Sequence, residues 1–482
     1  MCPPRLSSWR HACAVFASVL TLWSGPAAAQ PQQTLPTEVA VALDRAGIPR
    51  EAVAAVVAPA DGNGPARLAW RMDVPLNPAS VMKLTTTFAA LDLLGPAYTW
   101  RTPVFVDGPI RAGTLQGNLY LRGSGDPTLV MERLWLLLRQ VQARGITTIA
   151  GNIVVDGSAF AHQMRDPAAF DGQPLRAYNA APEAFLVNFK SVVLDWAPDV
   201  AAGVARIQVS PPLAGLAVQA TVPLAPAGTP CGDWRARTQM QTEDAGRWSF
   251  KGSYPVSCGE RSWAIAPAQP ELFAPRAVAG MWLALGGKLG GKATLGSVPV
   301  GLAPLFVYAS QPLFDAVQSV NKFSNNVMAQ QIFLTLGLEQ SGVGSPEAAR
   351  SVLQAWWQKR MGGAAMPVFD NGAGLSREAR ISPAALAHML QVAWTSPVMP
   401  ELMASMPIVG MDGTLRRSHS RAVGSAHLKT GSLEGVQAMA GYVLGSDGRR
   451  WVLVALVNHD RAAAARPALE ALIDWTSAPG HP

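Results

Sequence analysis

The pattern of hydrophobic and polar positions predicts strands and helices in separate parts of the chain. Residues 52–73 hold two short apolar runs on either side of the turn formers DGNGP, a pattern typical of paired strands. In the next segment, Leu84, Phe88 and Leu91 recur at helical spacing. Gly95 is followed by a proline, so we expect this helix to end there.

The stretch from about residue 100 to residue 267 is predicted to be rich in strands. GNLYLRGSGDPTL and GITTIAGNIVVDG are strand-like and surround one helical segment, MERLWLLLRQVQARG. After residue 267 helical patterns dominate. Ser345 and Ser382 are N-cap candidates there, because each precedes a proline at a first helical position. The C-terminal part returns to strands, with a predicted hairpin at 436–459, and ends on a helix.

These elements predict an α+β protein whose first domain is interrupted. Strands from both ends of the chain can join in one antiparallel sheet flanked by helices. We expect this domain to comprise residues 30–100 and 268–482. Residues 101–267 then form an inserted β-rich region of two small domains, and residues 1–29 form a signal peptide.

The N-terminus has the three parts of a secretory signal peptide. Arg5 and Arg10 form a basic start, ACAVFASVLTLW is an apolar run, and AAAQ supplies small residues for cleavage after Ala29. The apolar run is too short to cross a bilayer, and no later run is long and apolar enough. We therefore expect a periplasmic protein without a transmembrane anchor.

Composition and charge narrow the class of protein. Apolar residues make up 49% and charged residues 15% of the 482 positions, which is typical of a globular chain. The formal net charge of +7 favours anionic surroundings, although genome-wide arginine usage explains it equally well. No basic run indicates nucleic-acid binding, and no pair of histidines has the spacing of a zinc peptidase. We expect no cofactor and no metal.

Two of the four cysteines, Cys231 and Cys258, lie beyond the predicted signal peptide. An even pair in an oxidising compartment predicts a disulfide. Two buried free thiols are the alternative.

Ser80 and Lys83 stand three positions apart where the first helix begins. This spacing places both side chains on one helical face, and the first turn of a helix favours developing negative charge. A neutral Lys83 could take the hydroxyl proton, which would make Ser80 a nucleophile. A solvated helical lysine is the alternative. Ser319 and Lys322 repeat the spacing inside a later helix, where we interpret it as incidental.

The segment KFSNN places Ser324 and Asn326 at the end of a predicted helix. The hydroxyl could relay a proton to a leaving amine, and the amide could hold the backbone of a substrate. In isolation, a helix end rich in turn-forming residues explains this tripeptide better.

Lys429, Thr430 and Gly431 lie on a predicted edge strand ahead of the hairpin. Lys429 and Thr430 can bind a carboxylate, and Gly431 lets a substrate chain approach the backbone. The backbone N–H of Ser432 could join that of Ser80 as an oxyanion hole. An edge-strand lysine that guards against aggregation is the alternative.

The three motifs in this order are much harder to obtain by accident than any one of them. Ser-x-x-Lys, Ser-x-Asn and Lys-Thr-Gly form a set found in β-lactamases and penicillin-binding proteins. A positive Lys429 and partial burial would both lower the pKa of Lys83 and so favour its free base.

With these motifs, the chain resembles the D-alanyl-D-alanine carboxypeptidase/endopeptidase family of class C low-molecular-mass penicillin-binding proteins. The likeness covers nearly the whole mature chain and includes YNAAPEAFLVNF, FDNGAGLSREARISP and PIVGMDGTLRR. It implies a penicillin-binding/β-lactamase-like transpeptidase domain carrying two further β-rich domains. It also implies an acylated Ser80 with Lys83 as its base. Ser324 and Asn326 would then relay a proton and hold substrate, and residues 429–431 would hold a terminal carboxylate.

Three positions depart from the pattern of that family. Asn325 stands where Asp is common, Ala373 where Ser is usual, and Ser432 where Thr often follows the third motif. Residues 370–377 and 412–415 match further segments of the family, and we expect them to shape the cleft.

We therefore expect a periplasmic serine peptidase that cleaves D-alanyl-D-alanine or related cross-links in peptidoglycan stem peptides and is acylated by β-lactams. The alternatives are a β-lactamase, which releases its penicilloyl adduct rapidly, and a non-catalytic peptidoglycan-binding scaffold. Carboxypeptidase, endopeptidase and transpeptidase activity differ only in the acceptor or the scissile bond. All three stay open at this point, as does the oligomeric state.

Overall fold

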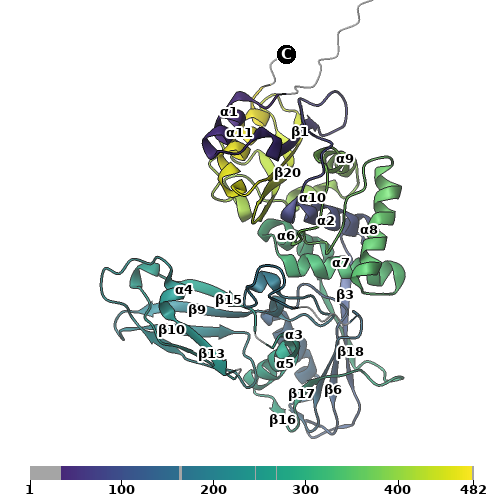
Figure 1. The fold of residues 1–482 in the computed structure, drawn as a ribbon. Helices are drawn as coiled ribbons and strands as arrows, with labels where there is room; N and C mark the ends of the chain where they lie inside the picture. The colour runs from purple at the N-terminus through teal and green to yellow at the C-terminus, as the bar shows by residue number, and fades with distance from the viewer. Residues whose placement is uncertain (1–33, 162–165, 245, 268, 480–482) are drawn as a thin grey trace, which may run out of the picture.

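The computed structural model describes residues 34–161, 166–244, 246–267 and 269–479 (Figure 1). The predicted signal peptide, residues 1–29, lies outside them. Both ends of the chain build one domain of helices around a sheet, and the middle of the chain extends away from it. Among the described residues, no helix combines the length and the apolar character that crossing a bilayer requires.

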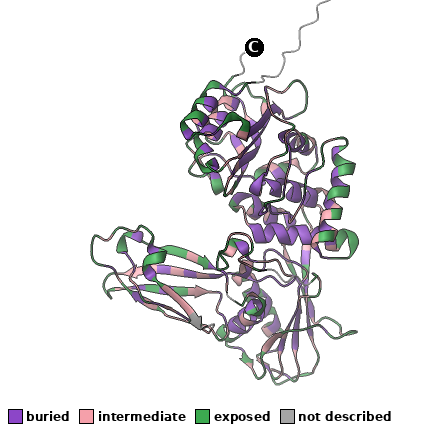
Figure 2. Cartoon of the chain, viewed as in Figure 1, coloured by how far each residue is buried: buried purple, intermediate pink, exposed green. Residues whose placement is uncertain are grey.

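The first domain is built on a five-stranded antiparallel sheet with the order β19-β20-β21-β1-β2. The two edges of this sheet come from opposite ends of the chain, as predicted. Residues 451–457 of the middle strand are all buried, because helices cover both faces of the sheet (Figure 2). The strands are β1 (Val53–Pro59), β2 (Leu68–Trp70), β19 (Ala426–Leu433), β20 (Val436–Leu444) and β21 (Arg450–Asn458).

In the described part of the chain, two helices cover one face of the sheet and six lie in the layer on the other face. Ser345 and Ser382 cap their helices as predicted, because each hydroxyl accepts a backbone N–H three residues on and a proline follows. The first pair is α1 (Thr37–Ala46) and α11 (Arg466–Ser477). The second group is α2 (Lys83–Leu94), α6 (Leu313–Phe323), α7 (Asn326–Ser341), α8 (Pro346–Met361), α9 (Pro383–Trp394) and α10 (Met399–Ser405).

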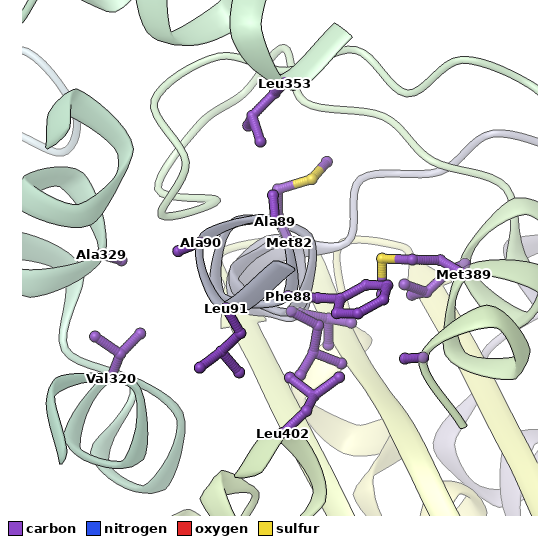
Figure 3. Packing of buried hydrophobic residues seen from close by; sticks show 14 of the residues in the cluster. Met82, Phe88, Ala89, Ala90, Leu91, Val320, Ala329, Leu353, Met389 and Leu402 are labelled. Atoms are coloured by element: carbon purple, nitrogen blue, oxygen red, sulfur yellow. The ribbon is translucent and has the colours of Figure 1, made fainter. Parts of the chain in front are cut away.

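Helix α2 lies in the middle of this second layer, and its residues 83–91 are all buried. Figure 3 shows Phe88 of α2 beside Met389 of α9, and Leu91 on the side of Val320 of α6. A helix packed on all sides cannot shift without opening voids in the core. Side chains at the start of α2 are therefore held in fixed positions.

The inserted region begins with a five-stranded sheet, order β17-β8-β6-β3-β18, and a smaller sheet, order β16-β7-β5-β4. Its helices are α3 (Met131–Ala143) and α5 (Phe273–Ala284). The strands are β3 (Thr99–Val106), β4 (Ile110–Arg111), β5 (Thr114–Leu115), β6 (Leu119–Arg122), β7 (Thr148–Ile149), β8 (Ile153–Asp156), β16 (Lys288–Leu289), β17 (Ala293–Leu295) and β18 (Phe306–Pro312).

This pairing carries the inserted region beyond its predicted end at residue 267. Strand β18 pairs with β3, β17 pairs with β8, and α5 packs against α3 in one hydrophobic core. The prediction of the boundary followed the change from strand to helix pattern after residue 267. An amphipathic pattern shows that a helix has a core to pack on, but not which core. Strand pairing places the return to the first domain at Pro312.

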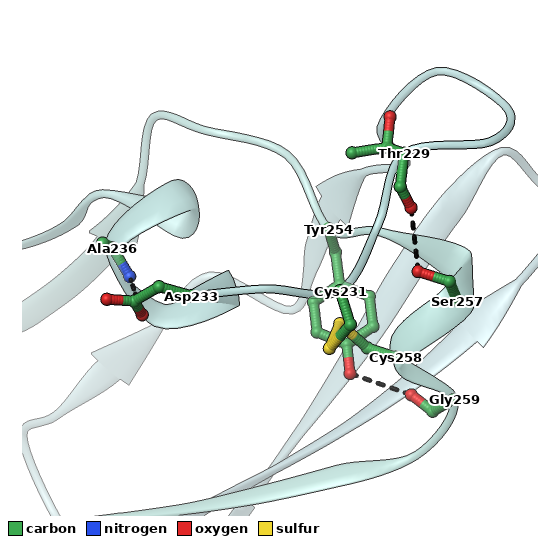
Figure 4. The surroundings of a disulfide bond; sticks show 8 residues. All are labelled: Thr229, Cys231, Asp233, Ala236, Tyr254, Ser257, Cys258 and Gly259. Carbon is green, nitrogen blue, oxygen red and sulfur yellow. Dashed lines mark hydrogen bonds between the residues drawn. A yellow bond between two sulfur atoms is a disulfide. The ribbon is translucent and has the colours of Figure 1, made fainter.

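The remaining part of the insertion forms an arm at the left of Figure 1, with sheets of order β12-β10-β9-β15 and β11-β14-β13. Cys231 and Cys258 are joined by the predicted disulfide (Figure 4). Beside it, the Tyr254 hydroxyl donates to the carbonyl of Gly259 at 2.8 Å. The elements are β9 (Val192–Asp199), β10 (Val204–Ser210), β11 (Ala217–Val218), β12 (Thr221–Pro223), α4 (Trp234–Thr238), β13 (Met240–Asp244), β14 (Arg247–Phe250) and β15 (Arg261–Ile265).

Candidate active site

Ser80 lies in a 3₁₀ turn, Ala79–Met82, that leads directly into α2. Ala79 has a φ of 46°, in the left-handed region that costs a non-glycine residue roughly 1–2 kcal/mol. Asn77 holds this conformation, because its Oδ1 accepts the Ala79 N–H at 2.8 Å and its Nδ2 donates to the Ser376 carbonyl at 2.8 Å. The strained turn presents Ser80 at the start of the rigid helix.

Lys83, the first residue of α2, is fully buried and contacts three oxygens. Its Nζ lies 2.8 Å from Ser80 Oγ, 2.7 Å from Asn326 Oδ1 and 2.6 Å from the Ala373 carbonyl. Burial, and secondarily the charge of Lys429, hold the pKa of Lys83 well below its usual value. Among the described residues, no carboxylate lies within ion-pair distance of Lys83 to oppose this shift.

These contacts suit a neutral amine. A carbonyl oxygen can only accept, so the two N–H bonds of neutral Lys83 go to Asn326 Oδ1 and to the Ala373 carbonyl. The lone pair then remains for the proton of the Ser80 hydroxyl. Because Ala373 contributes a backbone oxygen here, the departure from the family pattern at this position removes no contact of Lys83.

The second motif spans the junction of α6 and α7. Ser324 has a φ of 58° and turns the chain between the two helices. Asn325 caps α7, because its side chain accepts the N–H of Met328 at 3.1 Å, which an aspartate could do equally well. Asn326 therefore begins α7. Its Oδ1 faces Lys83, and its Nδ2 donates to the Tyr178 carbonyl at 3.2 Å.

The third motif lies on the edge strand β19. Lys429 is fully buried, and its Nζ donates to Ser324 Oγ at 2.9 Å and to the Thr430 carbonyl at 2.8 Å. Burial lowers the pKa of Lys429 to about 7. The lysine of the third motif is thus joined by a hydrogen bond to the serine of the second motif.

Gly431 lets β19 run directly beside the turn that carries Ser80. A Cβ at Gly431 would lie 2.6 Å from the Pro78 carbonyl and 3.1 Å from the backbone nitrogen of Ser80. The next residue, Ser432, donates from its hydroxyl to Gln437 Oε1 at 2.9 Å. Any side chain at Gly431 would therefore push the strand away from the serine.

The structure brings all eight predicted site residues into one region, although they come from three distant segments. The contacts described above connect the 3₁₀ turn with α2, the α6–α7 junction and β19. These eight residues are Ser80, Lys83, Ser324, Asn326, Lys429, Thr430, Gly431 and Ser432.

A cavity of about 450 Å³ opens above Ser80 and is lined in part by residues outside the three motifs. Two of these, Leu375 and Arg377, lie in the segment 370–377 that was expected to shape the cleft. Four others come from the inserted region, and Arg377 stacks its guanidinium 4.9 Å above the ring of one of these, Phe170. The segment around Phe170 carries no motif or periodicity that marks it as part of a site, because its position depends on how the insertion docks. The additional lining residues are Phe170, Asp171, Gln173, Tyr178, Leu375, Arg377, Leu433 and Glu434.

Within the described residues, no group of three or more His, Cys, Asp or Glu side chains could hold a metal ion. The groups in contact at the site include the hydroxyls of Ser80 and Ser324, two lysines of lowered pKa and the amide of Asn326.

Comparisons with known proteins identify the family of the chain. The model of the D-Ala-D-Ala carboxypeptidase 3 (S13) family matches residues 35–478. The chain is 27% identical over 416 residues to the D-alanyl-D-alanine carboxypeptidase of Actinomadura sp. strain R39, covering 82% of this chain and 75% of that protein. It is 25% identical over 386 residues to D-alanyl-D-alanine carboxypeptidase DacB of Haemophilus influenzae, covering 79% and 80%.

The fold is also shared with a solved structure. Penicillin binding protein 4 (dacB) of Haemophilus influenzae superposes with a TM-score of 0.71 at 22% identity, over 92% of this chain and 99% of that one. This similarity confirms the predicted α+β fold of a transpeptidase-like domain with inserted domains.

Proposed function

Since this chain belongs to the D-Ala-D-Ala carboxypeptidase 3 (S13) family and is a serine-type DD-carboxypeptidase acting on peptidoglycan, we propose that it works through an acyl-enzyme on Ser80. The observation that carries the proposal is the contact between Lys83 Nζ and Ser80 Oγ, 2.8 Å, at a lysine whose other two contacts are carbonyl oxygens. That arrangement provides a nucleophile together with its base.

In the first step Ser80 Oγ attacks the carbonyl carbon between the two D-alanine residues, and its proton passes to Lys83 Nζ. The lowered pKa of Lys83 supports this role, because it increases the fraction of the lysine that is present as the free base. The negative charge that forms on the carbonyl oxygen needs donors. The backbone N–H groups of Ser80 and Ser432 are our candidates, because β19 runs directly beside the turn that carries Ser80.

In the second step the C–N bond breaks and the leaving amine takes a proton. Ser324 is the candidate donor, and its contact with Lys429 at 2.9 Å supports a relay in which the lysine resupplies the hydroxyl. The proton that Lys83 took from Ser80 passes to the Ser324–Lys429 pair, which leaves Lys83 neutral and restores the charge of Lys429. A water then attacks the acyl carbon, and Lys83 takes a proton from it. As the acyl C–O bond breaks, Lys83 returns a proton to Ser80 Oγ and the shortened peptide leaves. β-Lactams acylate Ser80 in the same manner, because their ring amide takes the place of the scissile bond.

The carboxylate of the terminal D-alanine is proposed to bind between Lys429 and Thr430. Lys429 supplies positive charge, and Thr430, the next residue of the edge strand β19, supplies a hydroxyl. The stem peptide that precedes the scissile bond is proposed to occupy the cavity of about 450 Å³ over Ser80.

We also propose that the enzyme acts in the periplasm. The predicted signal peptide supports this location, as does the disulfide between Cys231 and Cys258, since disulfides persist in oxidising compartments.

Intact-mass analysis with penicillin tests the nucleophile. We expect one covalent adduct on the wild-type protein and none on Ser80→Ala, while Ser319→Ala, the serine of the second Ser-x-x-Lys, labels normally. Labelling that survives Ser80→Ala would overturn the assignment. The rate at which the adduct decays separates the peptidase from a β-lactamase, because a peptidase keeps its penicilloyl group.

A further inference from the structure

Lys322 forms an ion pair with Asp412, a residue on the loop that leads into β19. The Nζ and Oδ2 atoms are 2.6 Å apart, and the lysine side chain is only 10% exposed. The other carboxylate oxygen of Asp412 accepts the backbone N–H of Ile408 at 2.7 Å. One carboxylate therefore ties the last turn of α6 to the loop of residues 408–412.

Gly413 brings this loop against α6 directly. It has a φ of 52°, and a Cβ there would lie 2.5 Å from the Lys322 carbonyl. A larger residue would have to push the two segments apart and adopt a strained conformation. The ion pair and the glycine thus define one close-packed contact between the helix end and the loop.

Thr414, the next residue of the loop, reaches the third motif. Its Oγ1 lies 2.7 Å from Oγ1 of Thr430; Thr414 is exposed and Thr430 is half-buried. Each hydroxyl has a single proton. When Thr414 donates to Thr430, the proton of Thr430 is free to point at an anion.

The two partners of the ion pair each stand two residues before a contact with the third motif. Ser324 follows Lys322 and touches Lys429, while Thr414 follows Asp412 and touches Thr430. The Lys322–Asp412 ion pair therefore fixes the distance between Ser324 and Thr414, the residues that contact Lys429 and Thr430.

We propose that Thr414 is a positioning residue that directs the Thr430 hydroxyl to the terminal carboxylate of the substrate, and that the Lys322–Asp412 ion pair holds it in place. This inference rests on the proposed function, since it assumes that the carboxylate binds at Lys429 and Thr430. A hydrogen bond between an exposed and a half-buried hydroxyl contributes little to folding. The contact is therefore better explained by ligand binding than by stability.

A pair of thioester substrates isolates this effect. Both carry the same N-acyl-D-alanyl group, but one has thioglycolate as leaving group, with a carboxylate, and the other is the methyl thioester, without one. We expect Thr414→Val to lower kcat/KM for the thioglycolate ester about tenfold, mainly through KM, because a hydrogen bond to a charged group is weakened. For the methyl thioester, kcat/KM should change less than about twofold.

Two variants examine the mechanism further. Thr414→Ser keeps the hydroxyl and should restore the preference for the carboxylate-bearing ester. Asp412→Asn keeps an acceptor for Ile408 but loses the ion pair, and should reduce the same preference. Thr294→Val on β17, far from the site, is the matched control and should leave kcat/KM unchanged for both thioesters.

If Thr414→Val lowered kcat/KM equally for both thioesters, or for neither, the inference would be overturned. Failure of the proposed function has a different signature. In that case the Ser80→Ala variant would still hydrolyse the methyl thioester, whatever the residue at position 414.

Discussion

Lys83 Nζ lies 2.7 Å from Asn326 Oδ1, although 243 residues separate the two in the chain. Most of that separation is the inserted region, which leaves the first domain at β3 and returns to it at β18. The contact exists because α2 and α7 pack side by side in the same layer. The base of the proposed reaction is therefore oriented by a residue that belongs to a different motif.

Replacing Asn326 tests this orientation. In Asn326→Ala, one N–H of buried Lys83 loses its acceptor, and an unsatisfied buried donor costs about 1–3 kcal/mol. We expect the acylation rate with a chromogenic cephalosporin to fall roughly tenfold to a hundredfold. Stopped-flow absorbance measures it. Asn63→Ala, on an exposed turn, is the control and should acylate at the wild-type rate. An unchanged rate in Asn326→Ala would contradict the arrangement.

The charge of Lys429 should influence the pH at which activity is lost on the acidic side of the pH–activity profile. Lys83 acts when it is neutral, and activity is lost as the pH falls through its pKa. Burial lowers that pKa most and Lys429 lowers it further, so Lys429→Met should raise the pKa of Lys83 and move the acidic limb to higher pH. Burial still lowers the pKa of Lys83 in this variant. The pKa should therefore recover only part of its difference from the usual lysine value.

The methyl thioester is the substrate for this profile, since it does not need Lys429 to bind a carboxylate. Lys292→Met, a substitution at an exposed lysine of the inserted region, should leave the limb where it is. A limb that stays in place or moves to lower pH in Lys429→Met would refute the proposed coupling between the two lysines.

Binding of the substrate carboxylate should weaken above neutral pH. The pKa of Lys429 is about 7 in the free enzyme, so its positive charge is lost as the pH rises past that value. We expect KM for a D-alanyl-D-alanine peptide to rise with pH above about 7, by at most about tenfold per pH unit. KM for the methyl thioester should stay flat over the same range. Parallel profiles for the two substrates would argue against Lys429 as the carboxylate ligand.

Much of this site could be predicted from the sequence because its motifs depend on local geometry. The spacing of Ser80 and Lys83 is a property of one helical turn, and Ser324 to Asn326 lie at a junction marked by turn-forming residues. The sheet was predictable for a similar reason. Its strands are apolar runs bounded by turns, so their assignment needed no knowledge of distant contacts.

Features that depend on contacts between distant segments were not predictable in this way. The brace of Ser80 by Asn77 requires Ser376 on a remote loop, and Phe170 reaches the cavity only because the insertion docks beside Arg377. Helix α5 packs in the core of the inserted region and not in the first domain, where the prediction placed it, because an apolar helical run fits either core. Residues 162–165, close to the cavity-lining segment in sequence, lie outside the described part of the chain.

Gly431 offers a test of how closely β19 must approach the nucleophile. In Gly431→Ala, the new Cβ would lie 2.6 Å from the Pro78 carbonyl and 3.1 Å from the Ser80 nitrogen, distances that force β19 and the turn apart. Both proposed oxyanion donors lie along this contact, and displacing one such donor commonly lowers a rate by a factor of about a hundred or more. We expect acylation by penicillin to fall by about that factor. The melting temperature should change little, because β19 is an edge strand and can move outward.

Gly157→Ala is the matched control. A Cβ at Gly157 would have open space, and its backbone needs no left-handed conformation, so this variant should keep both the melting temperature and the acylation rate. Acylation at the wild-type rate in Gly431→Ala would show that the strand can withdraw without disturbing the site, and the oxyanion hole would then have to be sought elsewhere. A rate loss confined to Gly431→Ala, with the fold intact, follows only if the strand and the turn must touch for the reaction to proceed.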